Sequence, residues 1–294
     1  MIDSIIASDL DSSKQQLDED AFRSRKVLVT GGAGFIGSWL CDTLVSAKAT
    51  VYTIDNLSTG LMENIDHLLD HENFTFRKSD VTRPSPNDER YKLILHFASR
   101  ASPEEYKRHP IETLTANSLG TQNLLELARR NDTAFVYASS SEVYGDAEEI
   151  PTPETYWGKV NPIGQRSCYD EAKRYGEALC MAYRRKYSLD ARIVRIFNTF
   201  GPRIRSDGAY ARVVPRFIQQ ALKGEEITVF GDGKQTRSFC YIADTITGIL
   251  KVATYSGARG QVFNIGNPQE ITILDLAHKV KKLAGSTSRI VHRS

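Results

Sequence analysis

Two residues of the sequence have the types and spacing of an acid–base pair, Tyr169 and Lys173. A separation of four residues places both side chains on one face of a helix. An ammonium beside a phenol favours the phenolate and lowers a pKa that is ordinarily about 10, and the positive charge of a nicotinamide acts in the same direction. Such a phenolate can take the proton of a sugar hydroxyl while a hydride leaves that carbon for NAD⁺. Tyrosine and lysine also occur four apart by chance, so the surrounding elements decide what the pair means.

The stretch SSSEVYG, residues 139–145, comes directly after an apolar run. Serines and a carboxylate are poor material for a hydrophobic core. Open α/β sheets bind ligands at the carboxyl ends of their strands, so this stretch is predicted to lie at such an end. Ser140, Ser141 and Glu142 are therefore candidate site residues, and the role of Glu142 stays open.

The heptapeptide GGAGFIG, residues 31–37, contains GxGxxG and lies between a predicted strand and a predicted helix. Glycines permit a tight turn and close approach of a pyrophosphate, and the helix N-terminus offers free N–H groups to the phosphates. Asp55 ends the next predicted strand, where a carboxylate can accept hydrogen bonds from both ribose hydroxyls and would repel a 2′-phosphate, which favours NAD over NADP. Asp80 follows the strand after that and is placed to contact adenine. Two simpler interpretations stay open. The glycines could serve only a tight turn, and Asp80 could be a surface residue that starts a turn.

Strands alternate with helices through the first two-thirds of the chain. The predicted strands span residues 26–30, 50–55, 74–76, 92–97, 135–139 and 191–197, and the predicted helices span 38–47, 113–130 and 169–187. This alternation predicts an α/β fold with a Rossmann-type, doubly wound parallel sheet covered on both faces. After Gly201 the pattern loosens, with helices near 213–224 and 273–284 and a strand at 228–230. We expect a smaller C-terminal substrate-binding lobe there.

The predicted organisation has three parts. Residues 1–24 form an N-terminal extension, which is broken by acids, lacks the basic start of a signal peptide and is expected to be poorly ordered or loosely helical. Residues 25–200 form the NAD-binding domain. Residues 201–294 form the smaller sugar-nucleotide-binding lobe, with segments that return to the first domain.

The charge balance is close to neutral, because 38 basic and 36 acidic residues give a formal charge of +2. No general field points to nucleic acid or to a membrane, and no apolar stretch reaches the roughly 18 residues that span a bilayer. The four cysteines have no metal-ligand spacing, and His67 and His71 lack a third candidate ligand, so no metal site is expected. So few thiols in a large chain favour a reducing, cytoplasmic compartment.

The order of these motifs resembles the extended short-chain dehydrogenase/reductase superfamily, the NAD-dependent epimerases and dehydratases of nucleotide sugars. Within it, the stretches YWGKVNPIGQRSCYDEAKR (156–174), RIFNTFGPR (195–203) and FGDGKQTRSFCYIAD (230–244) resemble the UDP-glucuronate decarboxylases, or UDP-xylose synthases. The resemblance runs from about Arg25 to the end of the chain. In that group NAD⁺ oxidises C4 of the glucuronate, the resulting β-keto acid loses CO₂, and protonation and return of the hydride give UDP-xylose.

The resemblance implies roles for particular residues. Catalytic positions are matched by Tyr169 (base), Lys173 (its partner), Ser140 (hydrogen bond to the C4 oxygen), Glu142 (acid near the reacting carbons) and Arg237 (decarboxylation). Cofactor positions are matched by Gly31, Gly32, Gly34, Phe35, Ile36, Gly37, Asp55, Asn56, Asp80, Val81, Ala98, Asn117, Tyr169 and Lys173. Substrate positions are matched by Ser141, Tyr106, Asn198, Arg203, Val229, Phe230 and Arg237. Simpler alternatives are a surface ion pair of Arg237 with Asp232 or Asp244 and a turn capped by Asn198.

The resemblance also implies a homodimer, because relatives pair two long helices from each subunit, here 113–130 and 169–187. Two features differ from the group. Arg100 stands where the group usually has a proline. The group also continues past the position of Ser294, with an arginine that contacts the diphosphate, so the smaller lobe is expected to be C-terminally short.

Three other functions stay open. A nucleotide-sugar 4,6-dehydratase needs two adjacent acids after the strand, but the first of these positions is Ser141. A 4-epimerase needs no acid there, so Glu142 argues against it, though less strongly. A catalytically silent protein that binds NAD or a sugar nucleotide would have the same fold.

Overall fold

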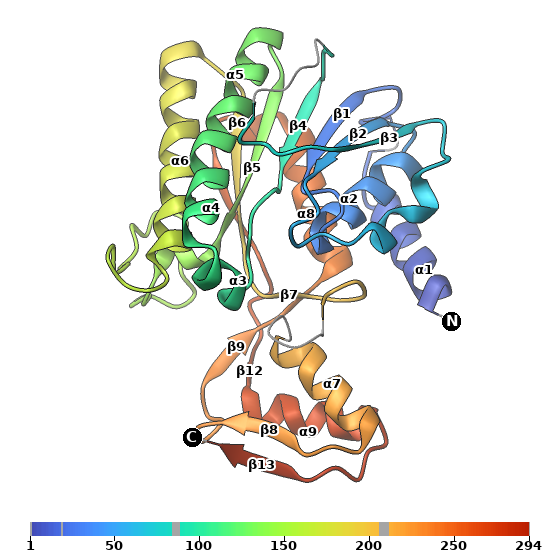
Figure 1. Cartoon of the computed structure of the whole chain (residues 1–294), viewed down its shortest axis with the longest axis vertical. Helices are drawn as coiled ribbons and strands as arrows, with labels where there is room; N and C mark the ends of the chain where they lie inside the picture. The colour runs from blue at the N-terminus through green and yellow to red at the C-terminus, as the bar shows by residue number, and fades with distance from the viewer. Residues whose placement is uncertain (1, 19, 84–88, 206–211, 294) are drawn as a thin grey trace.

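A parallel sheet forms the centre of the larger part of the molecule (Figure 1). The computed structural model describes residues 2–18, 20–83, 89–205 and 212–293. In the described chain the sheet has seven strands in the order β11-β6-β5-β4-β1-β2-β3, all paired in parallel. The strands are β1 (Lys26–Thr30), β2 (Thr50–Asp55), β3 (Phe74–Lys78), β4 (Leu93–His96), β5 (Ala134–Ser140), β6 (Ala191–Ile196) and β11 (Val262–Ile265). The order reverses between β1 and β4, which makes the sheet doubly wound and confirms the predicted α/β class.

Helices cover both faces of this sheet (Figure 1). On one face lie α2 (Phe35–Ser46) and α8 (Ile242–Thr254), and on the other lie α4 (Pro110–Thr115), α5 (Thr121–Asn131) and α6 (Ser167–Tyr187). Successive residues of a strand point to opposite faces. Accordingly Val27 and Val29 lie in the core under α2 and α8, whereas Leu28 lies in the core under α5 and α6. This two-sided burial explains why the strands read as continuous apolar runs.

The remaining elements of the larger part are short. A π-helical turn (Ala116–Gly120) joins α4 to α5. The predicted helix 113–130 is therefore continuous, but it consists of the end of α4, this turn and α5. The others are α3 (Pro103–Arg108) and the 3-10 turns Met62–Asn64, Asp66–Leu68, Ser141–Tyr144 and Ser256–Ala258.

The N-terminal segment is helical, one of the two states expected of it. Residues Ile2–Gln15 form α1, which packs beside α8 and α2. Ile6 and Leu10 contact the core under those helices, and the Tyr241 hydroxyl donates to Asp9 (2.6 Å). Asp11 is exposed, whereas Asp9 is half-buried and faces Tyr241, so the acids that interrupt the sequence pattern do not prevent α1 from packing.

A smaller lobe lies beneath the sheet (Figure 1). It pairs β8 (Ile227–Phe230) in parallel with β13 (Ile290–Arg293) and covers them with α7 (Val213–Lys223) and α9 (Ile273–Leu283). Two further pairs connect the parts: β7 (Thr199–Phe200) with β10 (Cys240–Tyr241), and β9 (Thr236–Ser238) with β12 (Glu270–Thr272). Between β10 and β12 the chain returns to the sheet as α8 and β11, and although a return to the first domain is expected, the sequence pattern does not locate these two elements.

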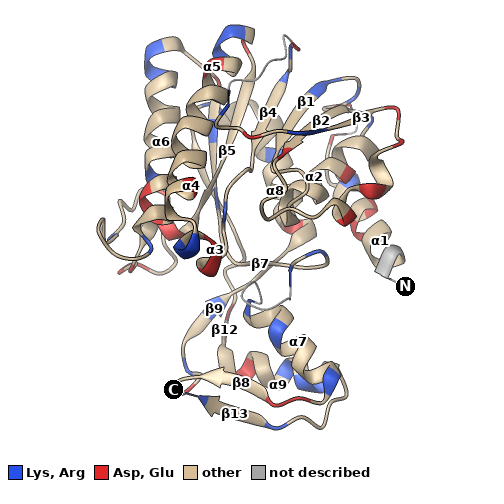
Figure 2. Ribbon diagram, viewed as in Figure 1, with Lys and Arg blue, Asp and Glu red and all other residues tan. Residues whose placement is uncertain are grey.

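Charged residues of both signs are spread over the larger part rather than gathered into one field (Figure 2). Within the described ranges no helix is both long and apolar enough to cross a membrane. The described residues also contain no cluster of histidine, cysteine and carboxylate side chains that could hold a metal ion.

Candidate active site

A cavity of about 920 Å³ lies between the carboxyl ends of the sheet strands and the smaller lobe. We call it the interlobe cavity. Most of the residues predicted for the site line it: Gly31, Gly34, Phe35, Ile36, Gly37, Asp55, Asn56, Asp80, Val81, Ala98, Tyr106, Ser140, Ser141, Glu142, Tyr169, Lys173, Asn198, Arg203, Phe230 and Arg237. Gly32, Asn117 and Val229 do not line it. The fold therefore brings together segments that are up to two hundred residues apart in the sequence.

The glycine loop is packed too closely to carry side chains. Gly31 has φ +75°, and a Cβ there would lie 2.8 Å from the backbone of Phe97 and Ala98. A Cβ at Gly32 would lie 1.7 Å from the Thr53 hydroxyl, so this glycine serves the contact with β2 and does not face the cavity. Gly34 does face it and precedes α2 without any side-chain cap. The first N–H groups of α2 are thus left for a phosphate, and the cradle fits a dinucleotide.

Asp55 lies at the end of β2 beside this loop. Its Oδ2 accepts a hydrogen bond from the Ala33 N–H (3.0 Å) and its Oδ1 accepts one from the Leu57 N–H (2.8 Å). Burial raises the pKa of Asp55, and the two backbone hydrogen bonds oppose that shift. Each carboxylate oxygen keeps a further lone pair toward the cavity, so the residue fits the two ribose hydroxyls predicted for it.

Asn117 lies in the π-helical turn and is fully buried. Its Nδ2 donates to the Ser99 hydroxyl (2.9 Å) and to the Thr113 carbonyl (2.9 Å). Because Ser99 lines the cavity and Asn117 does not, Asn117 reaches the site through Ser99.

Tyr169 and Lys173 lie in the first two turns of α6, and both are buried. The Lys173 ammonium donates to the Ala138 carbonyl (2.8 Å) at the end of β5 and lies 5.7 Å from the centroid of the Tyr169 ring. The Tyr106 ring stacks on the Tyr169 ring with centroids 5.1 Å apart. The predicted pair is therefore present, and a second aromatic ring fixes the plane of the phenol.

Burial dominates the electrostatics of this pair. It lowers the pKa of Lys173 to about 7, with the charge of Glu177 opposing. It raises the pKa of Tyr169, and the Ser140 hydroxyl and the Arg212 charge oppose that shift. The expectation that Lys173 holds the pKa of Tyr169 below its usual value is thus wrong for the protein alone, because both groups are desolvated together.

Ser140 and Glu142 occupy the turn that ends β5. The Ser140 Oγ accepts a hydrogen bond from the Glu142 N–H (3.3 Å) and so caps the 3-10 turn Ser141–Tyr144. The Glu142 carboxylate forms an ion pair with Arg166. The Arg166 Nε also lies 3.7 Å from the Asp170 Oδ2. Sequence reasoning missed Arg166, although it stands only three residues before Tyr169. The partner found for Glu142 is therefore an arginine on the loop before α6.

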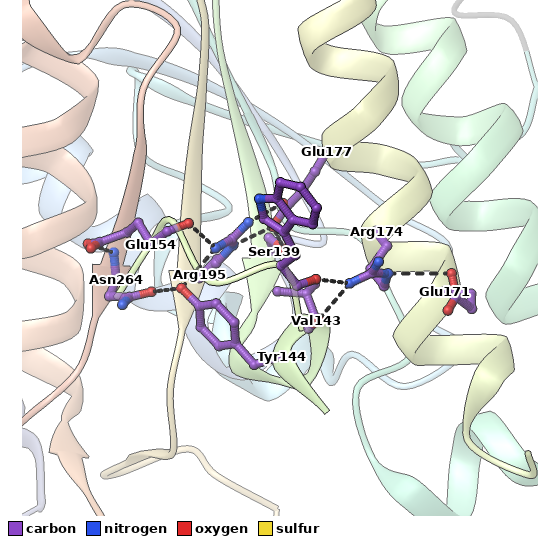
Figure 3. A network of polar contacts seen from close by, with 10 residues as sticks. Ser139, Val143, Tyr144, Glu154, Glu171, Arg174, Glu177, Arg195 and Asn264 are labelled. Atoms are coloured by element: carbon purple, nitrogen blue, oxygen red, sulfur yellow. Dashed lines mark hydrogen bonds and ion pairs between the residues drawn. The ribbon is translucent and has the colours of Figure 1, made fainter. Parts of the chain in front are cut away.

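A buried polar network lies directly behind this turn (Figure 3). Arg195 on β6 makes two hydrogen bonds to the Glu177 carboxylate, from Nε (2.9 Å) and from Nη2 (2.7 Å). Glu177 also accepts a hydrogen bond from the Ser139 hydroxyl (2.6 Å). Because Glu177 follows Lys173 by one helical turn and Ser139 precedes Ser140, the ion pair connects both catalytic segments to the neighbouring strand.

The network extends to the far strand of the sheet (Figure 3). The Tyr144 hydroxyl accepts from Arg195 (2.8 Å) and donates to Asn264 on β11 (2.7 Å). The Glu154 carboxylate accepts from the Asn264 N–H (2.8 Å). No spacing in the sequence indicates these contacts, because they join residues from 51 to 120 positions apart.

On the side of the smaller lobe, several predicted residues have protein partners. Arg203 (φ +70°) forms an ion pair with Asp42 on α2 (2.5 Å) and lies over the Trp39 ring. The Asn198 Nδ2 donates to the Ser238 carbonyl (3.2 Å). Arg203 therefore also joins the start of the smaller lobe to the glycine-loop helix.

Arg237 on β9 and Arg100 in the loop between β4 and α3 both line the cavity. Arg237 is exposed and donates to the Thr236 carbonyl (2.7 Å), and in the described part of the chain it forms no ion pair with Asp232 or Asp244. Arg100, the residue that departs from the related group, forms an ion pair with buried Glu105 (2.5 Å). Its charge is thus offset inside the protein.

Val229 corrects the prediction of a uracil contact. Its side chain is fully buried in the core of the smaller lobe with Phe217 and Leu276. Phe230 is half exposed and lines the cavity. Alternation along β8 sends adjacent side chains to opposite faces, so only one of the two can reach a ligand.

Comparisons with known proteins agree with this geometry. The profile of the NAD dependent epimerase/dehydratase family matches residues 27–266. The chain belongs to this family. The match confirms the resemblance to the extended short-chain dehydrogenases/reductases, and NAD is the cofactor of the family.

Curated relatives of this epimerase/dehydratase-family protein include UDP-glucuronic acid decarboxylases. The chain is 46% identical over 267 residues to UDP-glucuronic acid decarboxylase 1 of Xenopus tropicalis, which covers 90% of this chain and 62% of that protein. It is 46% identical over 266 residues to UDP-glucuronic acid decarboxylase 3 of Arabidopsis thaliana, covering 90% of this chain and 76% of that protein. The chain thus spans somewhat less than two-thirds of the length of the first of these relatives.

Solved structures with the same fold include epimerases and a dehydratase. The UDP-glucose 4-epimerase of Thermotoga maritima, solved with UDP-glucose, superimposes with a TM-score of 0.81 at 31% identity, covering 91% of this chain and 85% of that one. The dTDP-glucose 4,6-dehydratase DesIV of Streptomyces venezuelae, solved with NAD, gives a TM-score of 0.80 at 27% identity, covering 92% and 85%.

Proposed function

We propose that this protein is an NAD-dependent UDP-glucuronate decarboxylase that forms UDP-xylose. The observation that carries the proposal is the turn after β5, which has a single carboxylate, Glu142, and lines the interlobe cavity together with Tyr169. A 4,6-dehydratase needs a second acid at Ser141, whereas loss of CO₂ has no hydroxyl leaving group and needs none. The 46% identity to decarboxylases, compared with 27–31% to the epimerase and dehydratase structures, supports the same conclusion.

The glycine loop, Asp55 and Asp80 would hold NAD, with the pyrophosphate at the start of α2. Bound NAD supplies a hydride acceptor for C4 of the sugar, a positive charge that favours the Tyr169 phenolate, and the return of the hydride at the end of the cycle. The protein's part is to place the C4 hydroxyl between Tyr169 and Ser140 and to receive its proton.

Tyr169 takes the proton of the C4 hydroxyl while the hydrogen on C4 leaves as a hydride, and C4 becomes a ketone. The carboxylate at C5 is then that of a β-keto acid, and its C–C bond breaks with the electron pair passing into the ketone as an enolate while CO₂ leaves. The enolate takes a proton from solvent water at C5, and Tyr169 returns its own proton to the C4 oxygen when the ketone is reduced. Lys173 lies 5.7 Å from the centroid of the phenol ring and donates to the Ala138 carbonyl at the end of β5, so it orients Tyr169.

Arg237 and the Glu142–Arg166 pair would handle the acidic end of the sugar. A guanidinium matches the planar carboxylate with two parallel hydrogen bonds, and Arg237 is not occupied by a carboxylate of the described protein chain. Glu142 is held by Arg166 at the cavity wall, where it can position the ring or a water molecule near C5.

The proposal extends to assembly and location. The face of α4, the π-helical turn and α6 exposes Ile111, Leu114, Leu119 and Tyr175, which supports a homodimer through these helices. All four cysteines are free thiols, which supports a reducing, cytoplasmic compartment. We also retain residues 25–200 as the NAD-binding unit and 201–294 as the sugar-nucleotide unit.

The test is incubation with UDP-glucuronate and catalytic NAD⁺, with products identified by mass spectrometry. UDP-xylose and CO₂ in equal amounts are expected. UDP-galacturonate without CO₂ would replace the proposal with a 4-epimerase, and ligand binding without turnover would replace it with a silent binding protein.

A further inference from the structure

Arg216, in the first turns of α7, lines the interlobe cavity. Its guanidinium carbon lies 5.0 Å from the centroid of the Phe230 ring and 5.8 Å from that of Phe217. These rings hold the side chain in place but do not neutralise it. The Nε atom is buried and has no hydrogen-bond partner, and among the residues that the structure describes no carboxylate forms an ion pair with this arginine. Burial lowers the pKa of Arg216, and no acid opposes the shift.

Five other arginines of the cavity have oxygen partners. Three form ion pairs with carboxylates: Arg100 with Glu105, Arg166 with Glu142, and Arg203 with Asp42. Two donate to main-chain carbonyls: Arg212 to Ala101 and Arg237 to Thr236. The helix that carries Arg216 has basic residues and no acidic one (Figure 2). The α7 side of the cavity therefore holds positive charge that no carboxylate of the described residues offsets.

A desolvated guanidinium without a counter-ion is costly, and the cost falls when a ligand brings negative charge to it. The planar fork of arginine fits phosphate oxygens in particular. Arg216 contacts Phe230, the residue expected at the uracil end of the cavity, whereas Arg237 is the proposed partner of the sugar carboxylate. The pyrophosphate of NAD is expected on the other side, at the glycine loop.

We propose that Arg216 binds the diphosphate of the sugar nucleotide and makes the site selective for nucleoside diphosphates over nucleosides. The inference rests on the proposed function, which makes the ligand a UDP-sugar. The diphosphate would then be contacted from the first turns of α7.

The test is calorimetric titration of the full chain, saturated with NAD, with UDP and separately with uridine. Arg216→Met should weaken UDP binding by about ten- to a hundredfold, as expected for a charge-assisted contact, and should change uridine binding less than twofold. It should also reduce the salt dependence of UDP affinity. Lys223→Met removes the same charge from the exposed far end of α7 and serves as the control, with UDP affinity unchanged.

Unchanged NAD affinity and circular dichroism show that each variant is folded, and Arg216→Gln replaces the methionine variant if that one does not fold. UDP binding by Arg216→Met that equals the wild type overturns the inference, as does an equal loss for UDP and uridine. A wild-type protein that binds NAD but neither UDP nor uridine contradicts the proposed function instead.

Discussion

The Arg195–Glu177 ion pair is where a single substitution should reveal how the catalytic segments are held. Its side chains are only 11% and 13% exposed, and the two contacts of 2.9 and 2.7 Å are bidentate. Glu177→Gln keeps the shape and a hydrogen bond for Ser139 but leaves Arg195 with an uncompensated buried charge. Breaking a buried pair in this way costs about 3–5 kcal/mol, a large part of the roughly 5–15 kcal/mol that stabilises a typical domain.

Equilibrium unfolding in urea measures this loss, and Glu148→Gln provides the matched control. Glu148 also forms an ion pair, with Lys159, but both side chains are about two-thirds exposed. Solvent screening makes such pairs weak, so the control should unfold at the wild-type urea concentration.

Turnover separates positioning from stability alone. Ser139 adjoins Ser140, and Glu177 lies one turn from Lys173, so loss of the ion pair should displace both catalytic segments. At a temperature where the variant is folded, Glu177→Gln should therefore lower kcat on UDP-glucuronate at least tenfold. KM should change little. Equal unfolding midpoints for Glu177→Gln and Glu148→Gln, together with wild-type kcat, would refute the argument that this pair holds the site.

Three further substitutions test the site residues themselves. Tyr169→Phe should remove C4 oxidation while NAD affinity stays within about twofold, as measured by turnover and by titration with NAD; near-normal turnover would exclude the phenol as the base. Arg237→Ala should lower kcat/KM for UDP-glucuronate by about tenfold or more without changing NAD affinity, and an unchanged kcat/KM would leave it a surface residue. Burial lowers the pKa of Lys173 to about 7, so between about pH 7 and 10 the unfolded chain binds more protons than the folded one and the contribution of Lys173 to stability rises with pH. The difference in unfolding free energy between wild type and Lys173→Met should therefore grow in favour of the wild type from pH 7 to pH 9.5, and a constant difference would show that this lysine is not desolvated.

Local sequence patterns were sufficient for the Rossmann core. β1 and β2 have the predicted bounds, because apolar β-branched runs stand between clear turn signals. The glycine loop, Asp55 and the Tyr169–Lys173 pair lie in the cavity for the same reason, since each sits at the end of a strand or the start of a helix. These features depend on neighbours in the sequence.

Features that depend on distant contacts were not predicted. β11 pairs with β6 across some seventy residues, and α1 is stabilised by packing on α8 from the other end of the chain. Val229 was placed at the ligand by the resemblance to the decarboxylases, which does not show which of two adjacent strand residues faces the core. The pKa of Tyr169 was given the wrong direction because spacing shows the neighbouring charge but not the burial that outweighs it.

The central claim is that the carboxyl carbon of the sugar leaves as CO₂. UDP-glucuronate labelled with ¹³C at C6, incubated with the full chain and catalytic NAD⁺, tests this directly by NMR. We predict that the label appears as CO₂ and bicarbonate, with unlabelled UDP-xylose in equal amount and no net accumulation of NADH. Label that stays in a UDP-hexuronate would contradict the account.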